Sequence, residues 1–341
     1  MTRVDGWRLH AWGPDLRWES FEVGRPGPDE VLVEVEACGV GLTVLNCMNG
    51  DLDDSAGLLP LTPGHEVVGK VVDAGEGVDE SRLGERVMAY FYLSCMSCRQ
   101  CVSGQESRCE RLAGWYGVHR DGGYAPLTLL PAANALPLPA GLSGPDATVV
   151  PDAVATPVHV CMTRLALRLG DRVAVVGAGG GVGIHMVQVA AACGAAVAGV
   201  ERSNEKLALV EKLGAEPVSA TEMKSGNAGL GGPVDAVIDL VGTPATLRWA
   251  WGVLTTGGRL CVLTTFRGVE LTIDPRDFVF KECSIVGSRY ASRSELMQAA
   301  ELVASKAVRP VVGATVAPGD VTELHSELRA GKLNGRGALV W

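Results

Sequence analysis

A glycine-rich turn between an apolar strand and a helix constrains the fold of this chain more than any other feature. Residues 172–176 (RVAVV) predict a buried strand, and residues 177–183 read GAGGGVG. Residues 184–193 then predict a helix and residues 196–200 a second strand. In this context glycines let the backbone approach a pyrophosphate, whose charge lies at the helix N-terminus. The segment therefore predicts a dinucleotide-binding βαβ unit; a turn that only packs the helix on the strand is the alternative.

An acidic residue at the end of the second predicted strand favours NAD(H) as the dinucleotide. Glu201 stands near the spacing at which an acid binds the adenine ribose hydroxyls. Arg202 and Ser203 beside it could instead hold a 2′-phosphate, so NADP(H) stays open. The predicted cofactor contacts in this segment are Gly177, Gly179, Gly180, Gly181, Val182, Glu201 and Arg202.

The rest of the chain alternates between strands and helices after the turn and is β-rich before it, so the fold class is α/β. A doubly wound parallel sheet follows from the alternation. The tail from about residue 308 returns to short strands and turns and is expected to rejoin the first domain. Strands are predicted at 31–35, 66–73, 234–239, 259–263 and 284–286, and helices at 245–253 and 294–304.

Length and charge narrow the class of protein. A chain of 341 residues suggests two domains, and a formal net charge of −9 without a Lys/Arg cluster disfavours a nucleic-acid partner. Every apolar run is interrupted before it reaches membrane-spanning length, and the N-terminus has no apolar signal region. We therefore expect a cytoplasmic protein whose partner is a small-molecule substrate, with no nucleic acid and no membrane.

Four of the ten cysteines form a cluster with metal-ligand spacing, Cys95-x2-Cys98-x2-Cys101-x7-Cys109. Four thiolates in a short loop can close a tetrahedral shell around zinc. Iron–sulfur runs begin in the same way, but their fourth spacing is shorter and a proline follows it. Unrelated cysteines rarely cluster like this. The pattern predicts one structural zinc in a loop that stabilises the fold without direct catalysis.

Several motifs occur in the order seen in the zinc-type medium-chain dehydrogenases. They are Pro63-Gly64-His65-Glu66, the cysteine loop, Asp121-Gly122-Gly123-Tyr124, the glycine-rich turn and Gly335-Arg336, and the chain resembles this family over nearly its whole length. The resemblance implies a GroES-like β-rich catalytic domain at residues 1–150 and 290–341, with the zinc lobe at 91–111. It implies a Rossmann domain at 151–289 and an active site in the cleft between the two. By motif matching, further cofactor contacts fall on Thr156, Lys206, Val241, Leu263 and Arg336.

The chain departs from the family pattern where a catalytic zinc is bound. The family reads C-G-V-C-x-T-D, whereas this chain has Gly41 in place of the ligand cysteine and Val44 in place of the acid that orients the histidine. Asp152 falls at the third ligand position, and only His65 remains, with Glu66 beside it. Loss of two thiolates and of a supporting acid weakens zinc binding by orders of magnitude. We expect no stable catalytic zinc; an N/O shell of His65, Glu66 and Asp152 is the alternative.

The eroded zinc site changes the expected reaction of a nicotinamide-dependent oxidoreductase. Reduction of a plain carbonyl builds alkoxide charge that zinc stabilises, whereas conjugate reduction spreads the charge into an enolate that hydrogen-bond donors can stabilise. An ene-type reductase is therefore favoured over an alcohol dehydrogenase with an altered metal shell. A non-catalytic NAD(P)H sensor is the alternative of another class. Thr43, His65, Glu66 and Asp152 are the candidate catalytic residues. As alternatives, Thr43 caps or bonds local backbone and His65 is a buried structural histidine. Asp152 is expected to pair with His65 or to face water.

Aromatic residues near the cysteine loop are candidates for the substrate pocket. Phe91 falls where family members line that pocket, and Trp115 and Tyr116 could add walls, with core packing as the alternative. The resemblance also implies a homodimer or homotetramer formed through the edges of the Rossmann sheet.

Overall fold

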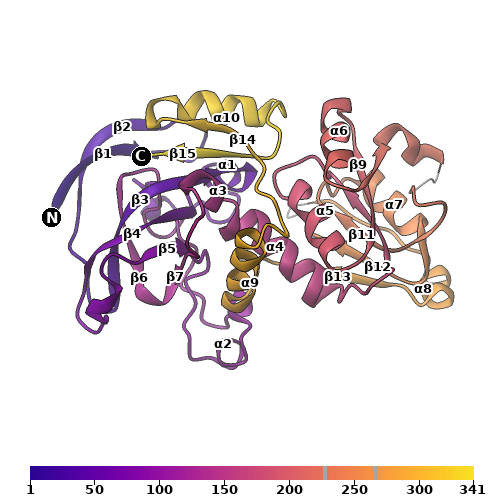
Figure 1. The fold of residues 1–341 in the computed structure, drawn as a ribbon, viewed down its shortest axis with the longest axis horizontal. Helices are drawn as coiled ribbons and strands as arrows, with labels where there is room; N and C mark the ends of the chain where they lie inside the picture. The colour runs from indigo at the N-terminus through magenta and orange to yellow at the C-terminus, as the bar shows by residue number, and fades with distance from the viewer. Residues whose placement is uncertain (226–228, 264–267) are drawn as a thin grey trace. The chain divides into compact units, whose positions relative to one another are not determined.

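The C-terminal end of the chain folds back onto its N-terminal region. In the computed structural model, strand β15 (Arg336–Val340) pairs antiparallel with β3 (Glu30–Val40). Figure 1 shows the yellow C-terminal elements beside the indigo N-terminal strands. The structure describes residues 1–225, 229–263 and 268–341. It divides into a first unit of residues 1–152, 291–305 and 310–341 and a second unit of residues 153–290 and 306–309.

The first unit is built around β3, the strand with the longest alternating pattern. Val31, Val33 and Val35 are buried while Glu34 between them is exposed, as expected for a strand with one face on the core. The sheet follows the order β14 (Val312–Val316), β15, β3, β4 (Glu66–Ala74), β5 (Arg86–Ala89) and β7 (Ala135–Pro137), with β6 (Leu127–Pro131) also paired to β3. A separate hairpin joins β1 (Thr2–Arg8) and β2 (Arg17–Val23).

The tail of the first unit contains a helix where the sequence suggested only short strands and turns. Helix α10 (Val321–Arg329) buries Val321, Leu324 and His325, whose spacing places them on one helical face. The polar residues between them hide that pattern in so short a segment. The other helices of this unit are α1 (Leu42–Met48), α2 (Arg99–Val102), α3 (Gly144–Ala147) and α9 (Arg293–Ala304).

The second unit contains a parallel sheet of the doubly wound kind, which confirms the predicted fold class. Its apolar strands are buried on both faces, as parallel strands covered by helices are. The strands follow the order β10 (Glu216–Ser219), β9 (Ala196–Glu201), β8 (Arg172–Val176), β11 (Val234–Asp239), β12 (Leu254–Val262) and β13 (Ser284–Gly287). Helices α5 (Gly183–Ala192), α6 (Asn204–Lys212), α7 (Pro244–Gly252) and α8 (Pro275–Lys281) pack against these strands.

The chain passes from the first unit to the second through irregular helix. Helix α4 (Ala155–Val158) is flanked by wide π-helical turns at Val150–Val154 and His159–Arg164. Such turns occur often at functional sites, because they change the direction of a side chain without ending the helix. Asp152 lies in the first of them.

Candidate active site

The glycine-rich turn lies between β8 and α5, at the carboxyl edge of the parallel sheet. Gly177 has a φ of +81°, a conformation that glycine adopts without steric cost. A Cβ on Gly183 would lie only 2.1 Å from the carbonyl oxygen of Gly177, so the turn closes tightly because that position is glycine. The turn therefore brings backbone N–H groups to the N-terminus of α5, which is the arrangement that binds a pyrophosphate.

The Glu201 carboxylate lies beside this turn at the end of β9. It accepts hydrogen bonds from the backbone N–H of Gly179 at 3.2 Å and of Arg202 at 2.7 Å. The Ser203 hydroxyl caps α6, because it accepts from the N–H of Lys206 at 3.4 Å. The Glu201 carboxylate is thus held in place. The Ser203 hydroxyl, which could contact a 2′-phosphate, is already hydrogen-bonded to the backbone at the start of α6.

The other sheet strands bring further predicted contact residues to the same edge. Asp239, which sequence reasoning missed, accepts from the N–H of Val241 at 2.8 Å and of Gly242 at 2.9 Å and so shapes the turn after β11. Leu263 follows β12 directly, and carboxyl ends of parallel strands share one edge. Of the remaining predicted contacts, Gly180, Gly181 and Val182 belong to the glycine-rich turn, Lys206 packs against Gly179, and Thr156 is buried in α4.

The four clustered cysteines converge as their spacing predicts. Their sulfur atoms lie within 4.8 Å of one another, with Sγ–Sγ distances of 3.5 Å between Cys98 and Cys101 and 4.0 Å between Cys98 and Cys109. A zinc ion with bonds of about 2.3 Å to four sulfurs separates them by roughly 3.8 Å. Backbone hydrogen bonding at Ser97 lowers the pKa of the Cys95 thiol to about 5, which favours the thiolate form that binds metal. These residues fit a structural zinc.

A second cluster of polar side chains is buried in the first unit, at the starts of two strands and in a π-helical turn. His65 and Glu66 come at the start of β4, Arg336 begins β15, and Asp152 approaches from its π-helical turn. His65, Glu66 and Arg336 are at most 3% exposed. His65 Nε2 lies 3.8 Å from the Asp152 carboxylate and 4.0 Å from that of Glu66. The predicted catalytic residues therefore lie together.

The Arg336 guanidinium links the two carboxylates of this cluster. Its Nη2 pairs with Glu66 Oε1 and lies 3.1 Å from Asp152 Oδ2. Burial lowers the pKa of Arg336 to about 10, partly offset by the nearby Cys38 thiol, so the group is still a cation at neutral pH. The sequence predicted Arg336 as a cofactor contact, and that role stays a prediction. Nothing in the sequence pointed to the pairing, because the partners are far apart along the chain.

Gly41 leaves the space that this guanidinium fills. A Cβ at position 41 would lie 1.9 Å from Arg336 Nη1. The backbone φ of Gly41 is −135°, an extended value open to any residue, so crowding by Arg336 alone makes a side chain costly there. The position that holds a ligand cysteine in the family pattern is thus adjacent to a buried cation.

Thr43 and Phe91 complete the surroundings of His65 and Asp152. The Thr43 hydroxyl, in the first turn of α1, lies 3.4 Å from Asp152 Oδ2 and donates to it. The Phe91 ring packs on the His65 imidazole with 4.4 Å between ring centroids. Among the described residues, His65 Nε2 has no hydrogen-bond partner.

The catalytic zinc that the resemblance implies does not fit these residues. Two of the three expected ligand positions carry glycine and aspartate, and the single positive charge of Arg336 already pairs with both carboxylates of the cluster. A dication would share the space with a guanidinium, and the two positive charges repel at short range in a buried site.

The remaining aromatic candidates differ in their surroundings. Trp115 is half-buried and packs edge-on against Tyr92, with 6.1 Å between centroids. Tyr116 is fully buried in the core, and its hydroxyl lies 2.7 Å from Thr128 Oγ1. This placement gives Tyr116 a packing role, and its part in a substrate pocket stays a prediction.

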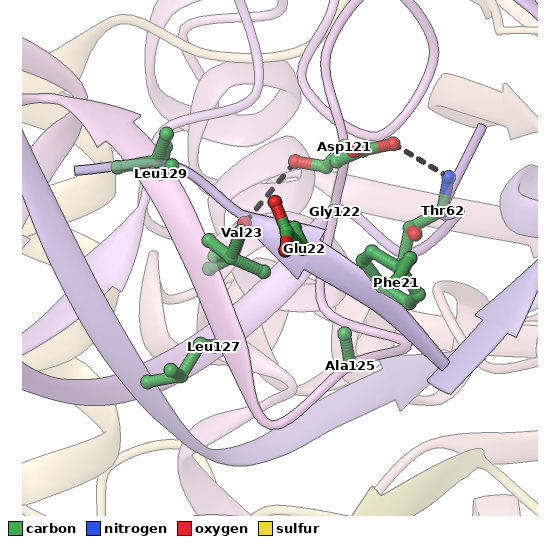
Figure 2. Close-up of a pocket in the computed structure, with 11 residues that line it drawn as sticks. Phe21, Glu22, Val23, Thr62, Asp121, Gly122, Ala125, Leu127 and Leu129 are labelled. Carbon is green, nitrogen blue, oxygen red and sulfur yellow. Dashed lines mark hydrogen bonds between the residues drawn. The ribbon is translucent and has the colours of Figure 1, made fainter. Parts of the chain in front are cut away.

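A pocket in the first unit lies apart from the predicted site residues. Figure 2 shows it between β2, which contributes Phe21 and Val23, and β6, which contributes Leu127 and Leu129. Asp121 at its rim accepts a hydrogen bond from the N–H of Thr62 at 2.7 Å. Its lining is polar and apolar in equal parts and includes none of the candidate catalytic residues.

Comparison with known proteins places these features in a family. Residues 27–140 match the model of the alcohol dehydrogenase GroES-like domain, and residues 181–305 that of zinc-binding dehydrogenases. An alcohol dehydrogenase of Geobacillus stearothermophilus is 34% identical over 93% of this chain and 94% of its own. An acryloyl-coenzyme A reductase of Metallosphaera sedula is 31% identical over 90% of each chain. The cobalt- and zinc-bound alcohol dehydrogenase of Pyrobaculum aerophilum has a TM-score of 0.90, 29% identity and full coverage of both chains.

The fold and the two sites define a nicotinamide-dependent oxidoreductase with a GroES-like and a Rossmann-like part. The chain belongs to the zinc-type medium-chain alcohol dehydrogenase-like family, and it is an enzyme of the medium-chain dehydrogenase/reductase class. In the part of the chain that the structure describes, no helix has the length and apolar character needed to span a membrane.

Proposed function

We propose that this enzyme reduces the carbon–carbon double bond of an α,β-unsaturated carbonyl compound, with NADH as the reductant and without a catalytic metal. The observation that carries the proposal is the Arg336 guanidinium beside Gly41, paired with Glu66 and Asp152. The two carboxylates that a metal would need are already paired with one fixed cation.

The charge that develops in the reaction decides which carbonyl chemistry such a site supports. Reduction of a ketone concentrates negative charge on one oxygen, and a bound metal ion stabilises that charge as a Lewis acid. Conjugate reduction delivers hydride to the β-carbon and a proton to the α-carbon, and the charge is shared between oxygen and carbon. Hydrogen-bond donors are sufficient for the smaller oxygen charge.

Thr43 and His65 are the groups that serve this chemistry in the proposal. The nicotinamide, when bound, supplies the hydride. The Thr43 hydroxyl donates to Asp152 at 3.4 Å, a long hydrogen bond that a substrate oxygen can displace. His65 is the candidate proton donor; its Nε2 lies 3.8 Å from the Asp152 carboxylate, and its ring packs against Phe91.

The names of the relatives agree with either of two reactions. Several curated relatives are named alcohol dehydrogenase, and two are named acryloyl-coenzyme A reductase, a name that denotes reduction of a double bond conjugated with a thioester carbonyl. An alcohol dehydrogenase with an altered metal shell is the second candidate. It is favoured by the ligand atoms of His65, Glu66 and Asp152, which lie within 4.8 Å of one another.

The Glu201 carboxylate supports a preference for NAD(H). It is fixed by two backbone N–H groups at the edge of the sheet, where a second phosphate would meet its negative charge. Arg202 is exposed and offers the opposite charge, so a weaker use of NADP(H) is compatible with the site.

A paired substrate panel with metal analysis tests the proposal. The purified protein is assayed with cyclohexenone and with cyclohexanone, each with NADH and with NADPH, and its zinc content is measured. We expect oxidation of NADH with cyclohexenone, slower oxidation of NADPH, little turnover of cyclohexanone, and one zinc per chain. Two zinc ions per chain with turnover of the ketone would contradict the proposal. Cofactor binding without turnover of substituted enones would instead indicate a sensor.

A further inference from the structure

We infer that His185 is a positioning residue for the dinucleotide, because its buried imidazole fixes the peptide group that offers a backbone N–H to the pyrophosphate. The inference rests on the cofactor half of the proposed function and holds for either candidate reaction. Neither the sequence motifs nor the comparisons assign this residue a role.

His185 lies in the first turn of α5, next to the glycine-rich turn. Its side chain is fully buried, and its Nδ1 lies 2.7 Å from the carbonyl oxygen of Gly181. A carbonyl oxygen only accepts hydrogen bonds, so Nδ1 carries the proton and donates it. The backbone of the glycine-rich turn therefore selects one tautomer of the ring.

The imidazole acts as a hydrogen-bond donor to the turn and not as a cation. Burial lowers the pKa of His185 from 6.5 to about 4, and the hydrogen bond to Gly181 opposes this shift only in part. At neutral pH the ring is uncharged and attracts no phosphate by charge. Its influence on a bound pyrophosphate therefore passes through the peptide group of Gly181.

The geometry of the peptide bond turns this contact into a direction for a donor. The bond between Gly181 and Val182 is planar and trans, so the C=O of Gly181 and the N–H of Val182 point in opposite directions. The C=O points at a buried ring, while Gly181 and Val182 are themselves only half-buried. In the part of the chain that the structure describes, the Val182 N–H has no hydrogen-bond partner. It is thus directed away from the core, as a donor to an anion at a helix N-terminus must be.

The glycine at position 181 gives the contact with His185 its importance. A glycine reaches many backbone conformations at little steric cost, so this peptide group can rotate unless its oxygen is held. Without the imidazole the direction of the Val182 N–H is no longer fixed. One hydrogen bond contributes up to about a tenfold factor to an equilibrium constant, and we expect pyrophosphate binding to weaken by about that factor.

Ligands that share the diphosphate test the inference without any turnover. Binding of NADH, ADP-ribose and adenosine is measured by calorimetry for the wild type and for His185→Leu, which removes the donor and keeps an apolar side chain. We expect the Kd of NADH and of ADP-ribose to rise about tenfold, and that of adenosine, which has no phosphate, to stay constant. His185→Asn keeps an N–H donor near the position of Nδ1 and should restore most of the affinity.

Gln188→Met is the matched control on the same helix. The buried Gln188 amide lies one turn further along α5, where Oε1 accepts from the N–H of Arg309 at 2.8 Å and Nε2 donates to its carbonyl oxygen at 3.1 Å. The variant loses buried hydrogen bonds away from the glycine-rich turn, so we expect a lower Tm and an unchanged Kd of ADP-ribose. A folded His185→Leu protein with the wild-type Kd would overturn the inference, and so would an equal rise for adenosine or for Gln188→Met.

Val182→Pro keeps the inference testable if His185→Leu does not fold. Proline removes the N–H, and its fixed φ is close to the −83° of Val182 at the start of α5. We expect the Kd of ADP-ribose to rise and that of adenosine to stay constant. An unchanged Kd of ADP-ribose would show that this N–H contacts no phosphate and would overturn the inference. Failure of the enone assay with normal NADH binding would reject only the proposed reaction.

Discussion

At the scale of single residues, burial sets the charge state of His325. Its imidazole lies in α10 within the core of the first unit, with Nε2 at 2.8 Å from the Tyr124 hydroxyl. Burial, helped by the nearby Arg329, lowers the pKa of His325 from 6.5 to about 4. The unfolded chain therefore takes up a proton between pH 6.5 and 4 that the native protein does not bind. Stability is fully present above pH 6.5 and falls as the pH drops through this window.

The substitution His325→Gln removes this titration and keeps a polar partner for Tyr124. The difference in pKa corresponds to at most about 3 kcal/mol of stability. We expect the Tm of the wild type to fall more steeply than that of the variant between pH 6.5 and 4, as measured by circular dichroism. Tyr124→Phe is the control, because it keeps the buried imidazole and should keep the steep slope. Parallel curves for wild type and His325→Gln would contradict the assignment.

The position of a site residue in the fold could be predicted from the sequence where it depends only on the spacing within one βαβ unit. Glu201 follows its strand directly, and the glycine turn stands beside it, so their meeting at the sheet edge is a property of one βαβ unit. The sequence also predicted that Gly41 lacks a ligand thiol. It gave no sign that Arg336 fills the space, because that contact depends on β15 pairing with β3.

At the scale of elements, the cysteine lobe depends on its metal more than on a core. Helix α2 has only four residues, and the 3-10 turn that follows it has three. Helices this short are not stable by themselves. The lobe also contacts α9, since Glu106 accepts a hydrogen bond from the N–H of Arg293 at 3.3 Å. Loss of zinc should therefore loosen both the lobe and the start of α9.

Removal of the structural zinc should lower the stability of the first unit. A metal at 100 times its dissociation constant contributes about 2.7 kcal/mol, which corresponds to roughly 5–10 °C in Tm for a unit of this size. We expect a decrease of this order for Cys101→Ser, with loss of zinc measured by mass spectrometry. Cys193→Ser, at a cysteine outside the cluster, is the control. An unchanged Tm in zinc-free Cys101→Ser protein would show that the lobe is held by other contacts.

The bounds of strands could be predicted from the sequence where the run of apolar residues is strong. They were predicted less well where this run is weak. Strands β8, β9 and β11 are mostly apolar, and the predicted spans match the observed ones closely. Strand β12 begins at Leu254, five residues before its predicted start at 259. The added residues contain a register shift, because Leu254 pairs with Val234 and Arg259 with Ala236, and Gly257 between them has a φ of +77°.

At the scale of the whole molecule, one sheet edge of the second unit presents an apolar surface. Among the described residues, β13 is paired only with β12, so its other edge is open. Ile285 on β13 is 42% exposed, and Val279 and Phe280 on the neighbouring helix α8 are 66% and 70% exposed. An open strand edge beside exposed apolar side chains is a surface that usually pairs with another chain.

We predict that two copies of the chain associate through β13 to form a dimer. Pairing of two open edges would satisfy their backbone N–H and C=O groups and cover the apolar residues of α8. The double substitution Ile285→Lys and Phe280→Glu puts charges into that interface and should shift the protein from dimer to monomer, as measured by sedimentation. Leu169→Lys changes an apolar residue of the same unit that is 89% exposed and lies outside this edge, so it should leave the dimer intact. A monomeric wild type at micromolar concentration, or an unchanged mass in the double variant, would place the subunit contact elsewhere.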